Sequence, residues 1–403
     1  MTSDSDVVVT ALARTPFGRF NGVLREHSGP ELGAAIIDEV CGRAKLPPGT
    51  ADAVYLGVGM IGSATLTPAR QAVLLSQLPN ETPSLAVDRA VCSGMTVLGL
   101  GLKDIKVGAA DTVICGGFES LSRTPLLMPR SRDRALGELV LGDPLLLRAP
   151  DFIGGSISTY TADEALKHGI DRPAQDAWAV ESHRRYFAAD AEGYFDFERT
   201  PICVPNGKSG DHVIDKDESP RRDTSIEKLA ALKTVHGSKT ITPGNAPGLN
   251  DGAAALILMS EKRVRELSVP ILSRIRGYAQ VSEGPTSGSY TPAIAIEQLL
   301  KRHGLTPDPL DLIEINEAFA ATVLVSTLRV AGKDPAAAEK LRARTNPHGG
   351  AVAIGHPLGA SGARIVMTLI NGLRRRGGGV GVGVAAICGG FGQGDSVLVE
   401  VRD

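Results

Sequence analysis

Two residues near the end of the chain have side chains that could do chemistry together. His356 lies in the glycine-rich stretch 346–362, just before a helix-like run, and Cys388 ends an apolar, strand-like run at 380–387. A histidine before a helix and a cysteine after a buried strand are typical of a nucleophile-and-base site. For a lone cysteine, the commoner alternative is an inert buried thiol beside a glycine-rich turn.

An internal repeat favours the catalytic interpretation. The sequence Ile-Cys-Gly-Gly-Phe occurs at 114–118 and again at 387–391. Upstream of each copy, a Ser-Gly pair (Ser93 and Ser361) opens an apolar helical run. Two such units predict a duplicated half-domain, in which equivalent loops meet at a pseudo-twofold axis. One half could then supply a nucleophile while the other supplies the histidine and the cysteine.

Composition indicates an ordinary globular enzyme. The chain has 403 residues, 42% hydrophobic and 22% charged, with 43 Lys and Arg against 45 Asp and Glu. The balanced charge argues against nucleic acid or a membrane surface as a partner. Five cysteines without paired spacing predict reduced thiols, no disulfide frame and no zinc site. With neither a targeting peptide nor a bilayer-spanning run in sight, we expect a cytoplasmic protein.

Apolar runs of strand length alternate with helical spacing, and this predicts an α/β fold with a buried, partly parallel sheet. The pattern weakens between residues 126 and 247, where one clear amphipathic helix is expected at 173–192. We expect this region to be an insertion that lies over the site. Apolar strands resume at 253–259, and a second half begins at 271.

Six motifs together make the whole chain resemble the thiolase family. Each is weak alone, but their order and spacing are highly specific. They are Arg14-Thr-Pro-Phe-Gly, Gly116-Gly-Phe-Glu-Ser-Leu-Ser122, Gly248-Leu-Asn-Asp-Gly-Ala-Ala254, Asn316-Glu-Ala-Phe-Ala320, the stretch 349–362 and the stretch 388–394.

The resemblance implies a duplicated five-layered αβαβα fold with an inserted loop domain. Its boundaries would be an N-terminal half at 1–123, a loop domain over the active site at 124–248, a return to the first half at 249–271, and a C-terminal half at 272–403. The resemblance also implies a homodimer or homotetramer. The reaction would be cleavage or formation of 3-ketoacyl-CoA in fatty acid metabolism, with coenzyme A as substrate and no other cofactor or metal.

Four site residues follow from the resemblance. The family's Gly-His-Pro histidine, which takes the proton from the nucleophilic thiol, matches His356. Its acid/base cysteine matches Cys388, and the glycine whose N–H contributes to an oxyanion hole matches Gly390. Asn316 matches the asparagine that holds a water in the oxyanion hole. The Asn-Glu-Ala-Phe form is that of ordinary thiolases.

The nucleophile is where this chain departs from the family. The family pattern is Asn-x-x-Cys-x-Ser-Gly, and this chain has Asp88-Arg-Ala-Val-Cys-Ser-Gly94. Aligned without a gap, Val91 takes the nucleophile's position, and only a one-residue deletion would make Cys92 the nucleophile. A helix start rotates about 100° per residue, so the two positions point in different directions.

Substrate-binding positions also differ. Ser156-Ile157 stands where some members carry a His-Met pair over the acyl pocket, and Pro247 where many carry a serine that touches pantetheine. The family's arginine near the coenzyme A phosphates matches Arg221, for which a solvated charge cluster is the alternative. These differences argue against the short acetoacetyl type of substrate.

Two functional hypotheses remain. The first is a thiolase-type acyltransferase with an acyl-cysteine on Cys92, His356 as base and Cys388 as acid/base. The second is a protein of the same fold that binds acyl-CoA without forming an acyl-enzyme. It would be a decarboxylase, a retro-Claisen lyase or a non-catalytic partner subunit, and Val91 favours it.

Overall fold

The structure is a computed structural model that describes residues 6–60, 66–128, 141–146, 149–205 and 210–402. Its first half forms a sheet with the strand order β1-β8-β5-β3-β4. The β1–β8 and β8–β5 pairs are antiparallel, whereas β5–β3 and β3–β4 are parallel. The elements of this half are β1 (Val7–Arg14), β2 (Gly18–Arg19), α1 (Gly29–Ala44), β3 (Ala53–Gly57), α2 (Pro68–Leu75), β4 (Ser84–Val87), α3 (Ser93–Lys106), β5 (Thr112–Ser120), β8 (Asn250–Ser260) and α7 (Glu261–Leu267).

The second half repeats this topology. Its strand order is β9-β12-β11-β10, with two antiparallel pairs followed by a parallel one. The two Ile-Cys-Gly-Gly-Phe copies begin in β5 and β11, which hold equivalent places, so the predicted duplication is confirmed. The elements of this half are β9 (Ser273–Ser282), η6 (Gly288–Tyr290), α8 (Thr291–Arg302), β10 (Leu312–Ile315), α9 (Ala320–Val330), α10 (Pro335–Ala343), α11 (Ala351–Ile354), α12 (Leu358–Arg376), β11 (Val380–Gly389) and β12 (Gln393–Arg402).

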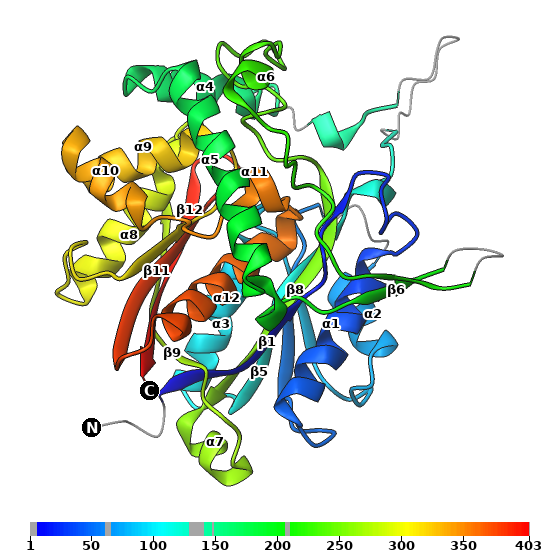
Figure 1. The fold of residues 1–403 in the computed structure, drawn as a ribbon. Helices are drawn as coiled ribbons and strands as arrows, with labels where there is room; N and C mark the ends of the chain where they lie inside the picture. The colour runs from blue at the N-terminus through cyan, green and yellow to red at the C-terminus, as the bar shows by residue number, and fades with distance from the viewer. Residues whose placement is uncertain (1–5, 61–65, 129–140, 147–148, 206–209, 403) are drawn as a thin grey trace.

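The helices and sheets form five layers (Figure 1). α3 and α12 pack on each other between the two half-sheets, α1 packs on the outer face of the first half-sheet beside α2, and α8 covers the second half-sheet beside α9. A short β1–β9 pairing at Val8–Arg274 and Val9–Ser273 joins the half-sheets. Because helices cover both faces, β5 and β8 are buried along their whole length, as their continuous apolar runs predict.

The central layer is tight because glycines line it. A Cβ on Gly94 of α3 would lie 2.3 Å from the carbonyl oxygen of Gly359 in α12, and one on Gly117 of β5 would lie 2.1 Å from the same oxygen. A Cβ on Gly362 would lie 2.4 Å from the backbone nitrogen of Met95. Backbone therefore meets backbone where the N-terminal ends of α3 and α12 cross.

The insertion leaves the first half after β5 and returns at β8. The amphipathic helix expected at 173–192 is α5. Sequence analysis missed α4 and the β6–β7 hairpin, whose three-residue strands are too short to show a period. The elements of the insertion are η2 (Leu121–Arg123), η3 (Pro144–Leu146), α4 (Ile157–Lys167), α5 (Arg172–Ala191), η4 (Tyr194–Phe197), β6 (Ile202–Val204), β7 (His212–Ile214) and α6 (Ile226–Ala230).

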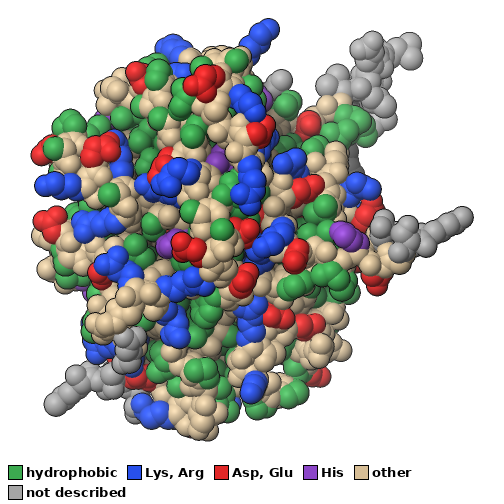
Figure 2. Space-filling model, viewed as in Figure 1, with side chains coloured by type: hydrophobic (Ala, Val, Ile, Leu, Met, Phe, Trp, Pro, Cys, Tyr) green, Lys and Arg blue, Asp and Glu red, His purple; other side chains and the backbone are tan. Residues whose placement is uncertain are grey.

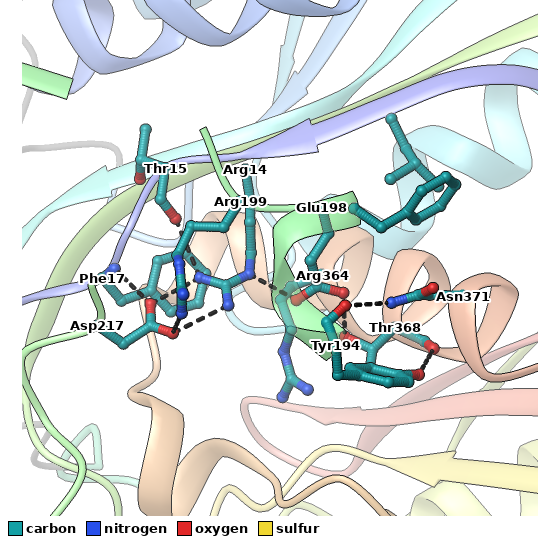
Figure 3. Close-up of polar contacts among 12 residues, drawn as sticks. Arg14, Thr15, Phe17, Tyr194, Glu198, Arg199, Asp217, Arg364, Thr368 and Asn371 are labelled. Carbon is teal, nitrogen blue, oxygen red and sulfur yellow. Dashed lines mark hydrogen bonds and ion pairs between the residues drawn. The ribbon is translucent and has the colours of Figure 1, made fainter. Parts of the chain in front are cut away.

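Buried charges attach the insertion to the first strand (Figure 3). Arg14, fully buried at the end of β1, donates from Nε to Glu198 (2.7 Å) and from Nη1 to Asp217 (2.7 Å). Glu198 in turn accepts a hydrogen bond from Thr368 of α12 (3.0 Å). One arginine thus links β1, the insertion and the central helix.

The surface carries charges of both signs. On the face in Figure 2, Lys and Arg side chains lie among Asp and Glu, in keeping with a formal net charge of −2. Among the helices that the structure describes, none is long and apolar enough to cross a membrane.

We predict that Gly94→Ala destabilises the protein by about 1–3 kcal/mol or more, because its methyl group would collide with a backbone carbonyl that has no room to move. Gly42→Ala in α1 is the matched control: no heavy atom lies within 4 Å of the added Cβ, and alanine favours a helix. Thermal or denaturant unfolding of the two variants measures the difference. Equal midpoints would show that the central contact is not tight.

Candidate active site

His356 stands in the short connection between α11 and α12. Its backbone N–H donates to Oδ1 of Asn250 (2.8 Å), at the start of β8. The preceding Gly355 has φ +112°, and a Cβ there would lie 2.8 Å from the Asn250 side chain. Glycine is thus required both for the backbone angle and for the space.

Hydrogen bonds fix the tautomer of His356. The Ser361 hydroxyl donates to the carbonyl of Pro357 (2.7 Å), so it accepts from Nδ1–H of His356, 2.6 Å away. Nε2 is then the unprotonated nitrogen, and the Asn316 amide nitrogen lies 3.4 Å from it as a donor. Burial, with a contribution from the charge of Arg364, lowers the pKa of His356 to about 3. The imidazole is therefore a neutral base at neutral pH.

Asn316 and Cys388 come from neighbouring parallel strands. The Asn316 N–H donates to the carbonyl of Ala386 (2.9 Å), two residues before Cys388 in β11. β10 and β11 are parallel, so their carboxyl ends meet at one edge, where α/β sheets place their sites. Burial raises the pKa of Cys388 to about 12. Cys388 is thus a protonated thiol at rest.

The turn before α3 lies against the turn after β11. A Cβ on Gly390 would lie 3.2 Å from the Cβ of Ala90. Ala90 has φ +50°, an uncommon angle for alanine. Its N–H donates to Asp88 (2.8 Å), and its carbonyl accepts from the Ser93 hydroxyl (2.5 Å). Ser93 thus bonds back to its own turn, as Ser361 does in the other half.

This turn buries Cys92 and leaves Val91 partly exposed. The Cys92 sulfur lies 3.7 Å from the carbonyl oxygen of Ile387, and a Cβ on Gly389 would lie 2.8 Å from that sulfur. Cys92 has no exposed surface, and burial raises its pKa well above the usual value. Val91 is only partly buried. Cys92 therefore lies beneath the end of β11, and its role as nucleophile stays a prediction.

A cavity of about 270 Å³ contains both residues that the resemblance connects with coenzyme A. It is lined by Arg221 and Pro247, together with Phe20, His183 and Leu249. The Arg221 N–H donates to Nδ1 of His183 (3.2 Å). Leu249 forms an isolated β-bridge with His356, so the cavity wall runs next to the His356 loop.

Two positioning residues were missed by sequence analysis. Ser361 appeared there only as part of a repeat, although its place on the first turn after the Gly-His-Pro loop could have indicated its contact with His356. Glu317 accepts hydrogen bonds from Trp178 (2.8 Å) and Ser182 (2.8 Å) of α5 and from the Val352 N–H (2.9 Å). It fixes the Asn316 loop to the insertion. The sequence does not reveal this role, because the buried partners of Glu317 lie far away in the chain.

Chemically, the arrangement places a neutral imidazole 3.4 Å from an amide donor, beside the end of the strand that carries a protonated thiol, in a duplicated α/β fold. No group of three or more His, Cys, Asp or Glu among the described residues could hold a metal ion.

Family models described as the thiolase N-terminal and C-terminal domains match residues 7–262 and 269–401. The acetyl-CoA acetyltransferase of Pseudomonas aeruginosa is 38% identical, over 99% of this chain and 100% of the relative. The beta-ketoadipyl-CoA thiolase of Pseudomonas knackmussii is 37% identical, over 98% and 99%. The crystal structure of human mitochondrial 3-ketoacyl-CoA thiolase aligns with a TM-score of 0.91 at 35% identity, covering 99% of this chain and 100% of that one. The chain therefore belongs to the thiolase family of coenzyme A-dependent acyltransferases.

We predict that iodoacetamide at pH 8 labels Cys203 quickly and leaves Cys92 unlabelled in the folded protein. Cys203 is exposed, whereas Cys92 is buried and its burial disfavours the thiolate that reacts with iodoacetamide. Peptide mapping after timed quenching measures both rates, with the buried Cys115 as reference. Labelling of Cys92 as fast as Cys203 would contradict the burial of Cys92 by the 89–92 turn.

Proposed function

We propose that the chain transfers acyl groups between a 3-ketoacyl-CoA and coenzyme A. The observation that carries this proposal is the hydrogen-bond chain that leaves Nε2 of His356 unprotonated next to Asn316, on strand ends shared with Cys388. Acyl transfer needs such a base to take the proton of a thiol.

The residues have separable tasks in the cleavage direction. His356 takes the proton of the attacking thiol, which adds to the C3 carbonyl. The C2–C3 bond then breaks, and the Cys388 thiol gives its proton to C2 of the leaving acetyl-CoA carbanion. Asn316 and the Gly390 N–H are the proposed donors to the oxyanions. Donors fixed in a buried site stabilise such charge without reorganisation.

Cys92 is the proposed carrier of the acyl group. Its sulfur lies beneath Gly389, at the turn that packs against Gly390. To meet a substrate, this sulfur has to leave its place below β11, so the 89–92 turn must open during the reaction.

A second candidate function is favoured by the partly exposed Val91 beside the buried Cys92. With valine at the position of the family's nucleophile, His356 and Cys388 would act on the α-carbon of an acyl-CoA without an acyl-enzyme. The reaction would be a decarboxylation or a retro-Claisen cleavage, and both need a proton acid where the carbanion forms.

Coenzyme A thioesters are the proposed substrates in both cases. The support is the cavity at Arg221 and Pro247, whose wall adjoins His356. We further propose that no other cofactor takes part, that the protein is cytoplasmic, and that its reaction belongs to fatty acid metabolism.

Intact-mass spectrometry with a panel of acyl-CoAs separates the two candidates. An acyl adduct on the wild-type chain that disappears in Cys92→Ala is the result expected for acyl transfer. No adduct on the wild type, but one on Val91→Cys, would overturn the role of Cys92 and leave the second candidate. Losing a covalent nucleophile costs several orders of magnitude in rate, so the difference is easy to measure.

We also propose that a second copy of the chain covers the free edge of the first half-sheet. In the described part of the chain, β4 pairs only with β3. Around this edge, α2 packs beside β4 and leaves large apolar side chains exposed: Leu74 (50%), Leu75 (57%) and Leu85 (44%). An open edge strand with apolar neighbours favours pairing with another strand. β4 also leads directly into the 88–92 turn, so such a partner would support the site.

We predict that Leu85→Asp lowers the native mass to that of one chain of 42.1 kDa, because a charge at the edge disfavours burial against a second copy. Val380→Asp is the control, since Val380 is also exposed (61%) but lies in the second half-sheet. Light scattering after size exclusion gives the masses. A wild-type monomer, or a Leu85→Asp variant with unchanged mass, would rule out this interface.

A further inference from the structure

The buried polar residues of α12 do not all have the same role. Thr368 donates to Glu198 (3.0 Å) and its carbonyl accepts from Tyr194 (2.7 Å), while Asn371 donates to the Tyr194 carbonyl (2.6 Å). These two residues anchor η4 of the insertion. Arg364 lies one turn closer to His356 and does not share this role.

Arg364 is buried with two of its three nitrogens lacking a hydrogen-bond partner among the described residues. Only 1% of the residue is exposed, and Nε and Nη1 have no hydrogen-bond partner among the described residues. In Figure 3 its guanidinium lies beside the network around Glu198, and no dashed line joins it to the other residues drawn. Among the described residues, the carboxyl group within 4 Å of it is that of Glu314, whose Oε2 is 3.8 Å from Nη1 and also has no hydrogen-bond partner there.

The position of this pair connects it to the site. Glu314 lies in β10 two residues before Asn316, so both side chains belong to the strand face that packs on α12. Arg364 lies on the second turn of α12, the helix that follows His356, and belongs to the helix side of that contact. A buried pair of an arginine and a carboxyl group without hydrogen bonds contributes little to stability, because desolvation offsets any attraction. A role beyond stability is therefore the better explanation.

We propose that Arg364 is a positioning residue that places a buried positive charge behind His356 and Asn316, and that Glu314 sets how much of that charge the site experiences. This inference rests on the proposed function, because it concerns the anions formed during chemistry on an acyl-CoA. The positive charge keeps His356 unprotonated in the resting site, and it opposes the imidazolium that forms when His356 takes a proton. The same charge stabilises each thiolate, oxyanion or carbanion that forms in front of it.

Charged groups around the pair agree with this assignment. Those that act on Glu314 are Arg364 of α12, Glu317 after β10, Glu198 after η4 and Arg185 of α5. Glu198 and Glu317 also act on Arg364, as does Arg14. Burial raises the pKa of Glu314 to about 8. Glu314 is thus largely uncharged at neutral pH and leaves the charge of Arg364 uncompensated, whereas above pH 8 its carboxylate offsets that charge.

Two variants test the proposal in opposite directions. Arg364→Met removes the positive charge, and kcat should fall about tenfold or more with little change in KM, because only anionic states lose stabilisation. Glu314→Gln keeps the positive charge at all pH values. The ratio of its kcat to that of the wild type should rise between pH 7 and pH 9, and this ratio cancels the ionisation of the thiol substrate. Arg364→Lys retains a charge and should restore part of the activity.

A measurement that needs no turnover separates failure of this inference from failure of the proposed function. Histidine-selective NMR, with the signal assigned through His356→Gln, reports the protonated fraction of His356. At the lowest pH where all variants stay folded, Arg364→Met should raise that fraction about tenfold, corresponding to one pKa unit. Glu314→Gln and Arg364→Lys should not raise it. The proposal is overturned if His356 titrates alike in all variants. It is also overturned if Arg364→Met and Glu314→Gln shift the protonated fraction of His356 in the same direction. If Arg364→Met does not fold, Glu314→Gln and Arg364→Lys still give the pH-dependent kcat ratio and the rescue.

Discussion

The contact between α3 and α12 is the constraint on which the rest of the molecule depends. The Gly359 carbonyl sits 2.1 Å and 2.3 Å from where the Cβ atoms of Gly117 and Gly94 would be, so no side chain fits between the two halves at this point. Backbone packing of this kind forces the N-terminal ends of both central helices together. The Ser93 turn and the His356 loop stand at those ends. A site shared between the halves therefore follows from sterics before any polar contact is made.

Buried charge then holds the insertion to this frame. Arg14 binds Glu198 and Asp217 with no exposure to solvent, and Arg199 also reaches Asp217 (3.3 Å). Removing one partner from such a network leaves an uncompensated charge and typically costs about 3–5 kcal/mol. Glu198 also accepts a hydrogen bond from Thr368, so the insertion is held in place against α12 as well as β1. With the insertion held in this position, the cavity wall at Leu249 lies next to His356.

Much of this arrangement could be predicted from sequence, because it depends on periodicity and repetition. The duplicated topology followed from the repeated Ile-Cys-Gly-Gly-Phe, and the loop position of His356 from its glycines and proline. The pairing of Arg364 with Glu314 could not be predicted, since it joins a helix to a strand with nothing in either pattern to mark the contact. The direction of the Cys92 side chain depends on the positive φ of Ala90. Alanine has no preference for the left-handed region, so this φ could not be predicted from the sequence.

The left-handed Ala90 also bears on how the site works. A non-glycine residue in this region carries strain and persists only where its surroundings hold it, here through Asp88 and Ser93. The turn it forms leaves Val91 partly exposed and buries the Cys92 thiol against the end of β11, the strand that carries the protonated Cys388. The groups of the resting site are thus uncharged, and the charge that acts on His356 is that of Arg364. A neutral site backed by a buried cation is organised for an anion that arises only during the reaction. Both candidate functions generate that anion at the α-carbon of a thioester, which explains why one arrangement of His356, Asn316 and Cys388 serves either of them.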